Sequence, residues 1–192
     1  MTPFLRGLIA SAALAVCAPF ASAAVLSFDD IVGADGYAAV PTNYGGLDWS
    51  AAGWSAFSGA QAPYTAHSGD GRITTAWGSD DAASVIRFLA PTVFDGAWFA
   101  GFGDASVSFQ MFLGGQLVAS STTLGLSETP AFLSSGWTGA IDAVVVSSAF
   151  QAFYVMDDFS FQDATDVPEP GTLALVLAGL GLAVRTARRR SV

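Results

Sequence analysis

Two acidic pairs are the residues in this sequence best able to do chemistry. Asp29-Asp30 closes an extended segment near the start of the chain, and Asp157-Asp158 lies in the last extended segment. The first and last strands of many β-sandwiches are neighbours, so the four carboxylates could meet, with one Asp of each pair pointing inward. Clustered carboxylates attract a cation, and Ca²⁺ accepts several oxygen ligands. The pairs therefore predict either a structural Ca²⁺ site or solvated acids that cap turns.

Aromatic residues form a second candidate site early in the chain. Tyr44, Trp49 and Trp54 lie in a stretch that also contains Asn43 and Asp48. Rings with nearby amides and carboxylates are what a sugar-binding surface uses, because the rings stack on pyranose faces. The same rings also suit the core of a β-domain, where aromatic side chains bury a large area. The sequence leaves both readings open: a glycan-binding surface or core packing.

Catalytic side chains are scarce. His67 is the single histidine, and Ser68 follows it directly, but adjacency along the chain does not assemble a Ser-His-Asp triad. No segment resembles a nucleophile elbow, and one histidine cannot supply the ligands of a zinc site. We therefore expect a protein that is not an enzyme. The alternative is a secreted carbohydrate-active enzyme that uses an Asp pair.

The segment that must position these residues, 24–166, predicts an all-β fold. It is rich in Gly, Ser, Thr, Val and aromatic residues, and its clearest periodicity is two, as in Ser106–Met111. Gly114-Gly115 then separates two extended segments and predicts a hairpin. Turn signals include Ala90-Pro91 and Asp95-Gly96. Many short strands at this spacing predict an antiparallel β-sandwich or jelly roll, with extended segments at 24–28, 83–89, 97–102, 106–111, 116–120, 140–147 and 153–161.

The charge of this segment excludes one class of function. Residues 24–167 contain 15 Asp or Glu residues but only two arginines, a formal charge of −13, and the chain has no lysine. Such a surface repels nucleic acid and anionic lipid. We expect no nucleic-acid partner.

The N-terminus predicts a signal peptide over residues 1–23. Arg6 supplies a positive charge, residues 7–16 are apolar, and Ala21-Ser22-Ala23 has the form of a signal-peptidase site. The alternatives are a buried N-terminal helix and a lipoprotein signal that would use Cys17, although Val16 is bulky for the latter. Cleavage after Ala23 would leave an exported protein without cysteine, and hence without disulfides.

The C-terminus combines a proline-rich linker, an apolar run and an arginine cluster. Pro168-Glu169-Pro170 stiffens an extended linker. The 14 uncharged residues 171–184 would span about 21 Å as a helix, against a hydrocarbon core of roughly 30 Å. A buried core helix would have to accommodate the arginines at its end. The features instead predict a marginal single-pass helix held on the cytoplasmic side by Arg185, Arg188, Arg189 and Arg190.

The sequence Val167-Pro168-Glu169-Pro170-Gly171-Thr172-Leu173-Ala174-Leu175, with the apolar run and the terminal arginines, resembles the PEP-CTERM sorting signal of exported Gram-negative proteins. Gly171 departs from the Ser often found at its position. The resemblance implies recognition by an exosortase, a membrane cysteine peptidase that cuts near Pro-Glu-Pro. It also implies release to the cell surface or the exopolysaccharide matrix, after a membrane-anchored intermediate.

The central domain resembles, more loosely, the sandwich domains that PEP-CTERM proteins carry. The resemblance rests on Phe28-Asp29-Asp30, on residues 44–49 and on residues 156–161. It implies no common activity. The sequence thus predicts a signal peptide (1–23), a β-sandwich domain (24–166) and a sorting signal (167–192). We expect a structural or adhesive protein that binds extracellular polysaccharide.

Overall fold

Antiparallel strands dominate the computed structural model, which describes residues 23–34, 36–75, 84–148, 150 and 153–163. Within these residues one short 3-10 helix, η1 (Tyr44–Gly46), interrupts the strands. The strands are β1 (Ala23–Leu26), β2 (Tyr37–Ala39), β3 (Leu47–Asp48), β4 (Trp54–Phe57), β5 (Arg72–Thr75), β6 (Ser84–Gly101), β7 (Ser106–Leu113), β8 (Gln116–Ser120), β9 (Leu124–Gly125), β10 (Ala131–Ser134), β11 (Ile141–Ser148) and β12 (Tyr154–Asp163). The all-β, antiparallel prediction is confirmed. The predicted C-terminal helix and residues 1–22 of the predicted signal peptide lie outside the described residues, whereas Ala23, predicted as the last residue of the signal peptide, begins β1.

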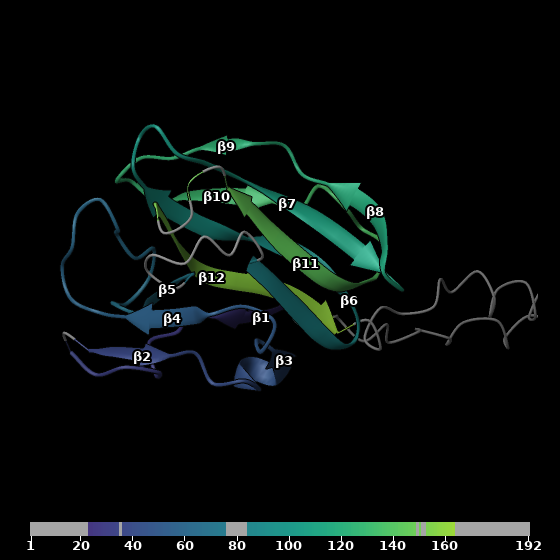
Figure 1. Ribbon diagram of the computed structural model, residues 1–192, viewed down its shortest axis with the longest axis horizontal. Helices are drawn as coiled ribbons and strands as arrows, with labels where there is room; N and C mark the ends of the chain where they lie inside the picture. The colour runs from purple at the N-terminus through teal and green to yellow at the C-terminus, as the bar shows by residue number, and fades with distance from the viewer. Residues whose placement is uncertain (1–22, 35, 76–83, 149, 151–152, 164–192) are drawn as a thin grey trace, which may run out of the picture. The chain divides into compact units, whose positions relative to one another are not determined.

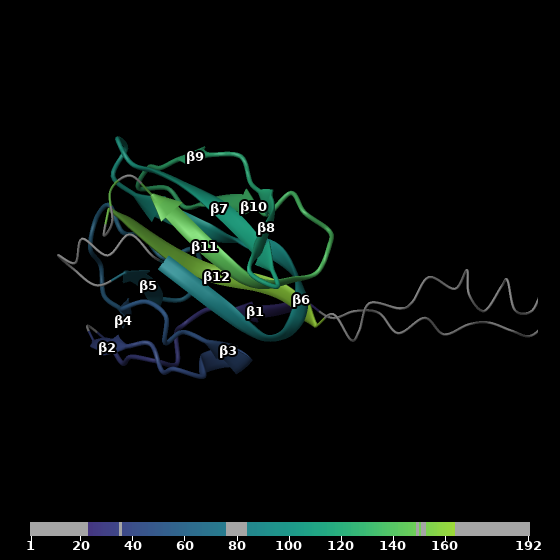
Figure 2. The same ribbon diagram turned by 45° about the vertical axis from the view of Figure 1, so that its right-hand side comes forward.

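The strands form one hydrogen-bonded sheet, which the 18-residue strand β6 divides into two layers (Figure 1). The first half of β6 pairs with β3 and β11, and β11 leads to β7 and β8. The second half pairs with β10 and β12, and β12 continues to β5, β4 and β2. Both views show β7, β8 and β9 on one side and β2, β3 and β4 on the other (Figure 2).

The core lies between the two layers and consists largely of aromatic rings. Phe109 of β7 contacts Phe94 and Phe99 of β6, with ring centroids 4.8 and 5.6 Å apart. Phe159 of β12 stacks on Phe94 at 4.7 Å, and its edge meets Trp49 at 6.0 Å. All five side chains are 0–2% exposed. The contacts of Phe109 join β7 to β6, two strands that are not paired with each other, and such packing between layers is that of a β-sandwich.

β6 corrects one part of the prediction. The sequence predicts turns at Ala90-Pro91 and Asp95-Gly96, but both dipeptides lie inside this strand. A register shift against β11, where Ile141 faces Thr92 and Ala143 faces Arg87, makes room for a bulge at residues 88–91. Proline is tolerated in a bulge because no ladder hydrogen bond needs its missing N–H group. The Gly114-Gly115 hairpin between β7 and β8 is confirmed.

Candidate functional site

Three of the four paired acidic residues, Asp29, Asp157 and Asp158, hold the loop between β4 and β5, residues 58–71, which we call the covering loop. Tyr64 of this loop packs with Phe57, Ala100 and Val155 in a small apolar cluster separate from the main core. Ala100 and Val155 face each other on β6 and β12. The covering loop therefore lies over the outer face of the β6–β12 layer, opposite the core.

Asp29 binds the end of the covering loop. Its Oδ1 accepts hydrogen bonds from the backbone N–H groups of Asp70 and Gly71, at 2.8 and 2.7 Å. Burial raises the pKa of Asp29, but the N–H bonds from Gly71 and Asp70 and the hydroxyl of Ser27 outweigh it and lower the pKa below its ordinary value.

Glycine at position 69 allows the Asp29 carboxylate to lie close to the backbone of the covering loop. Gly69 has a φ of +51°, and a Cβ atom there would lie 2.2 Å from Asp29 Oδ1. The sequence Ser68-Gly69-Asp70-Gly71, expected as a turn, is thus shaped around the Asp29 carboxylate.

Asp157 binds the same loop from β12. One carboxylate oxygen accepts the N–H groups of His67 and Ser68 at 2.7 and 2.9 Å, and the other accepts the N–H of Asp158 at 2.7 Å. Asp157 is 2% exposed. Burial is the main cause that raises the pKa of Asp157 to about 6, and the neighbouring charge of Asp158 raises it further. The N–H bonds from the backbone lower the pKa but do not cancel these two causes.

Asp158 contacts the loop through side chains. Its Oδ2 lies 2.6 Å from Nδ1 of His67, and its Oδ1 accepts the hydroxyl of Ser68 at 2.8 Å. Neighbouring strand residues normally point to opposite faces. Here Asp158 has a φ of +45°, and the β12–β6 register shifts between Asp157 and Ser160. This irregularity lets both carboxylates reach the same loop, which the alternation assumed from the sequence does not allow.

His67 and Ser68 do not form a catalytic triad with Asp158. The Ser68 hydroxyl donates to Asp158, and the His67 ring binds the other oxygen of the same carboxylate. The His67 ring also stacks on Trp98 of β6, with centroids 3.5 Å apart and planes at 11°. A general base must accept the proton of the nucleophile, and this arrangement gives that bond to the carboxylate instead.

Arg72, the first residue of β5, binds both ends of the covering loop. It is 2% exposed, and its guanidinium donates to the backbone carbonyls of Asp70, at 2.7 Å, and Gly59. It also lies over the ring of Phe57, 4.4 Å from the centroid. Burial lowers the pKa of Arg72, although the charges of Asp70 and Asp157 act in the opposite direction and raise it. The Nε atom of Arg72 is buried without a hydrogen-bond partner among the described residues. Arg72 was not among the site residues predicted from the sequence, although it is one of two arginines in an acidic domain.

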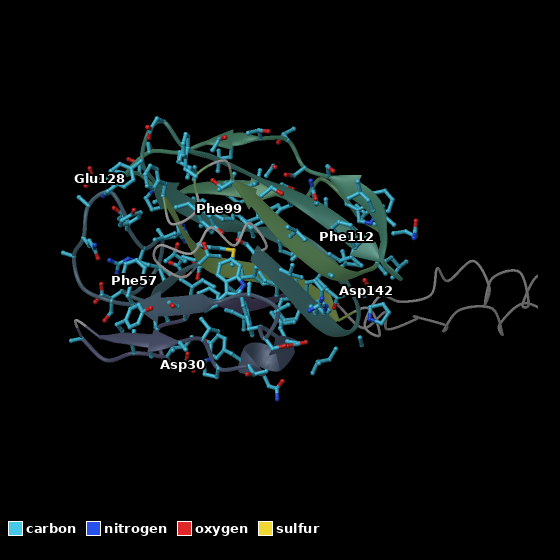
Figure 3. The ribbon with its side chains drawn as sticks, viewed as in Figure 1. Asp30, Phe57, Phe99, Phe112, Glu128 and Asp142 are labelled. Carbon is cyan, nitrogen blue, oxygen red and sulfur yellow. The ribbon has the colours of Figure 1, made fainter. Side chains whose placement is uncertain are left out.

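The fourth predicted carboxylate, Asp30, lies elsewhere. It accepts the hydroxyl of Tyr44 at 2.6 Å. Burial and this acidic neighbour raise the pKa of Tyr44. Figure 3 shows Asp30 near η1, away from the end where Glu128 lies. In the described ranges, no three His, Cys, Asp or Glu side chains are grouped to hold a metal ion. The Ca²⁺ site stays a prediction without geometric support, because the oxygens of Asp29 and Asp157 already accept N–H bonds.

Trp49 and Trp54 require a correction as glycan-binding residues. They are 2% and 3% exposed, and their indole N–H groups donate to the carbonyls of Tyr44 and Val85. Their rings meet edge to face at 5.8 Å inside the core. A buried indole has no free face to stack on a sugar, so the core reading holds for both.

A family match identifies the C-terminal segment. Residues 166–191 match the PEP-CTERM protein-sorting motif, and they include Pro168, Glu169 and Pro170. The chain carries a PEP-CTERM sorting motif. This motif implies an exported protein that is processed by an exosortase and passes through a membrane-anchored intermediate. A search of curated proteins gave no significant match to this chain.

The described part of the chain was also examined for a membrane-spanning helix. Across the ranges that the structure describes, no helix has the length and apolarity needed to cross a bilayer. The sorting triplet and the arginines at 185 and 188–190 lie outside those ranges, and their predicted roles rest on the motif and the sequence.

Proposed function

We propose that this PEP-CTERM protein delivers its β-domain to the cell surface or extracellular matrix of a Gram-negative bacterium, where the domain has a structural or adhesive role. The observation that carries the proposal is the sorting motif at residues 166–191, which follows two residues after β12 ends. Signal peptidase would remove residues 1–23, and the exosortase would cut near Pro168–Pro170.

The geometry of the domain fits a role without catalysis. The polar groups that could react, on His67, Ser68 and Asp157, are engaged in fixing the covering loop. The domain carries a strong negative charge, which favours solubility outside the cell and opposes binding to anionic surfaces.

Sorting can be tested by replacing Pro168, Glu169 and Pro170 with alanine in the full chain, expressed in an exosortase-containing host. We expect the wild type to appear at the surface or in the medium with the C-terminal tail missing by intact-mass analysis. The triple variant should stay in the membrane fraction at a higher mass. Glu128→Ala, which removes an exposed acid from the domain, is the matched control and should be processed normally. A wild-type protein that keeps Val192 would overturn the proposal.

A secreted carbohydrate-active enzyme is the second candidate. The observation in its favour is that the carboxylates of Asp157 and Asp158 reach the same loop, and that burial raises the pKa of Asp157, since glycosidases use a pair of carboxyl groups of which one holds a proton. Release of reducing sugar from a polysaccharide panel, lost in Asp157→Asn, would favour this candidate.

A further inference from the structure

The β-domain has two ends with different compositions. At one end β12 finishes, beside the start of β1, where Ala23 pairs with Gln162. At the other end Tyr154 of β12 pairs with Gly101 of β6. The ten residues of β12 separate the two ends by about 30 Å. The chain continues from the end of β12 into the sorting motif, so the Gly101–Tyr154 end is the one farther from that point of attachment; we call it the distal end.

Exposed phenylalanine rings gather at the distal end. Phe102, Phe150 and Phe153 are 38–47% exposed. The rings of Phe102 and Phe153 lie 5.1 Å apart, and Phe150 stacks on Phe153 at 5.5 Å. The N–H of Phe102 donates to the carbonyl of Phe153 at 3.1 Å, and a Cβ atom at Gly101 would lie 2.2 Å from that carbonyl. The backbone hydrogen bond therefore brings the residues Phe102 and Phe153 side by side.

A cavity with a mixed polar and apolar lining adjoins this ring cluster. It has a volume of about 340 Å³ and is lined by exposed Gln61, Thr65 and Glu128, with Arg72 at its base. Tyr64 also lines it, and the edge of this ring meets Phe102 at 5.5 Å. In Figure 3 Glu128 and Phe57 lie at the same end of the domain, opposite Asp142. The volume falls at the small end of ligand pockets, roughly 300–1,000 Å³.

We propose that the distal end is a binding site for neutral polysaccharide, with pyranose rings stacked on Phe102 and Phe153 and sugar hydroxyls hydrogen-bonded in the cavity. Rings next to an amide, a hydroxyl and a carboxylate match a ligand with apolar faces and hydroxyl edges. The charge of −13 over residues 24–167 repels anionic polymers, anionic lipids and a second copy of the domain. The identity of the ligand as an extracellular polymer rests on the proposed export of the protein.

Binding can be measured by isothermal titration of the full chain, purified with its C-terminal tail intact, with cellohexaose and chitohexaose as neutral probes and oligogalacturonate as an anionic one. We expect a neutral probe to bind and the anionic probe not to bind. Phe102→Ala and Phe153→Ala should each weaken binding about tenfold, as expected for a ring at the centre of a contact. Gln61→Ala should weaken it less. Phe132→Ala is the matched control, because this ring is also 42% exposed but belongs to β10.

The outcomes separate this proposal from the sorting function. Loss of neutral-sugar binding in Phe102→Ala, with circular dichroism and Phe132→Ala unchanged, supports the distal site. Absence of binding to both neutral probes overturns it. An affinity for neutral sugars that is unchanged in Phe102→Ala and Phe153→Ala also overturns it. Dimerisation or vesicle binding that these two variants abolish would overturn it as well. None of these results depends on C-terminal cleavage, which the mass analysis of the sorting variant reports independently.

Discussion

The two faces of the β6–β12 layer are stabilised by different forces. The inner face buries Phe94, Phe99 and Phe159, which pack against other rings. The outer face buries Arg72 and Asp157, which hold the covering loop through hydrogen bonds to its backbone. Apolar burial is insensitive to pH, whereas a buried carboxylate changes its contribution with its protonation state. One layer therefore combines a permanent core with a loop attachment that responds to pH.

The largest expected effect comes from the inner face. Phe159→Ala removes a fully buried ring that contacts Trp49, Phe88 and Phe94. We expect the free energy of unfolding to fall by about 3–5 kcal/mol at every pH between about 5 and 7.5. Urea denaturation measures it. Phe132→Ala, at an exposed ring, should change stability by less than about 1 kcal/mol. Equal losses in the two variants would contradict the assignment of Phe159 to the core.

A smaller effect, with a defined pH window, comes from the outer face. The folded pKa of Asp157, about 6, exceeds its ordinary value of 3.8. Between these values the folded protein holds the proton and the unfolded chain has released it, so stability falls as pH rises from about 4 to 6. We expect up to about 2 kcal/mol of this loss to come from Asp157. Urea denaturation from about pH 4.5 to 7 measures the slope.

Substitution of Asp157 sharpens the comparison of the two faces. Asp157→Asn should remove most of the pH dependence of the unfolding free energy, even though this variant is less stable than the wild type. Phe159→Ala and Glu128→Gln should keep that pH dependence. A slope that persists in Asp157→Asn would show that the pH response does not come from this carboxylate.

The smallest expected difference is between two glycine substitutions, one of them next to Asp29. Gly69→Ala combines a positive φ with a clash against the Asp29 carboxylate, whereas Gly114 has a similar φ of +59° and no atom within 4 Å of the place that a Cβ would occupy. We expect about 1 kcal/mol of loss for Gly114→Ala and about 2 kcal/mol for Gly69→Ala. Thermal unfolding compares them. Equal losses would mean that Asp29 moves aside without cost.

The alternating strand β7 was predicted from the sequence, whereas β4 and β5 were missed. Residues 106–111 alternate polar and apolar side chains and form β7 as expected. All four residues of β4, and all four of β5, are buried, because the covering loop and the core enclose both faces. Such short strands leave no period-two pattern to detect. This is why Arg72 and the outer face escaped the sequence analysis.

The candidate site was predicted by residue type more accurately than by arrangement. Asp29, Asp157 and Asp158 do act on one segment, but as acceptors for the N–H and O–H groups of the covering loop. The φ of Asp158 and the β12 irregularity depend on tertiary packing, which period-two alternation cannot reveal. The buried tryptophans were misplaced for a related reason: Gly, Asn and Asp around a ring do not tell whether it faces water or core.

The position of β12 has a consequence for the order in which the domain can form. β12 is the last strand among the described residues, yet it pairs with β1, β5 and β6 in the interior of the sheet. Because a protein is synthesised from its N-terminus, β12 becomes available after the other described strands. Until then β1, β5 and β6 each lack one of their pairing partners. Closing the sheet must then wait for contacts between distant parts of the chain, which are slow to form. The sheet is therefore complete only once β12, the described strand nearest to the sorting motif in the sequence, is available.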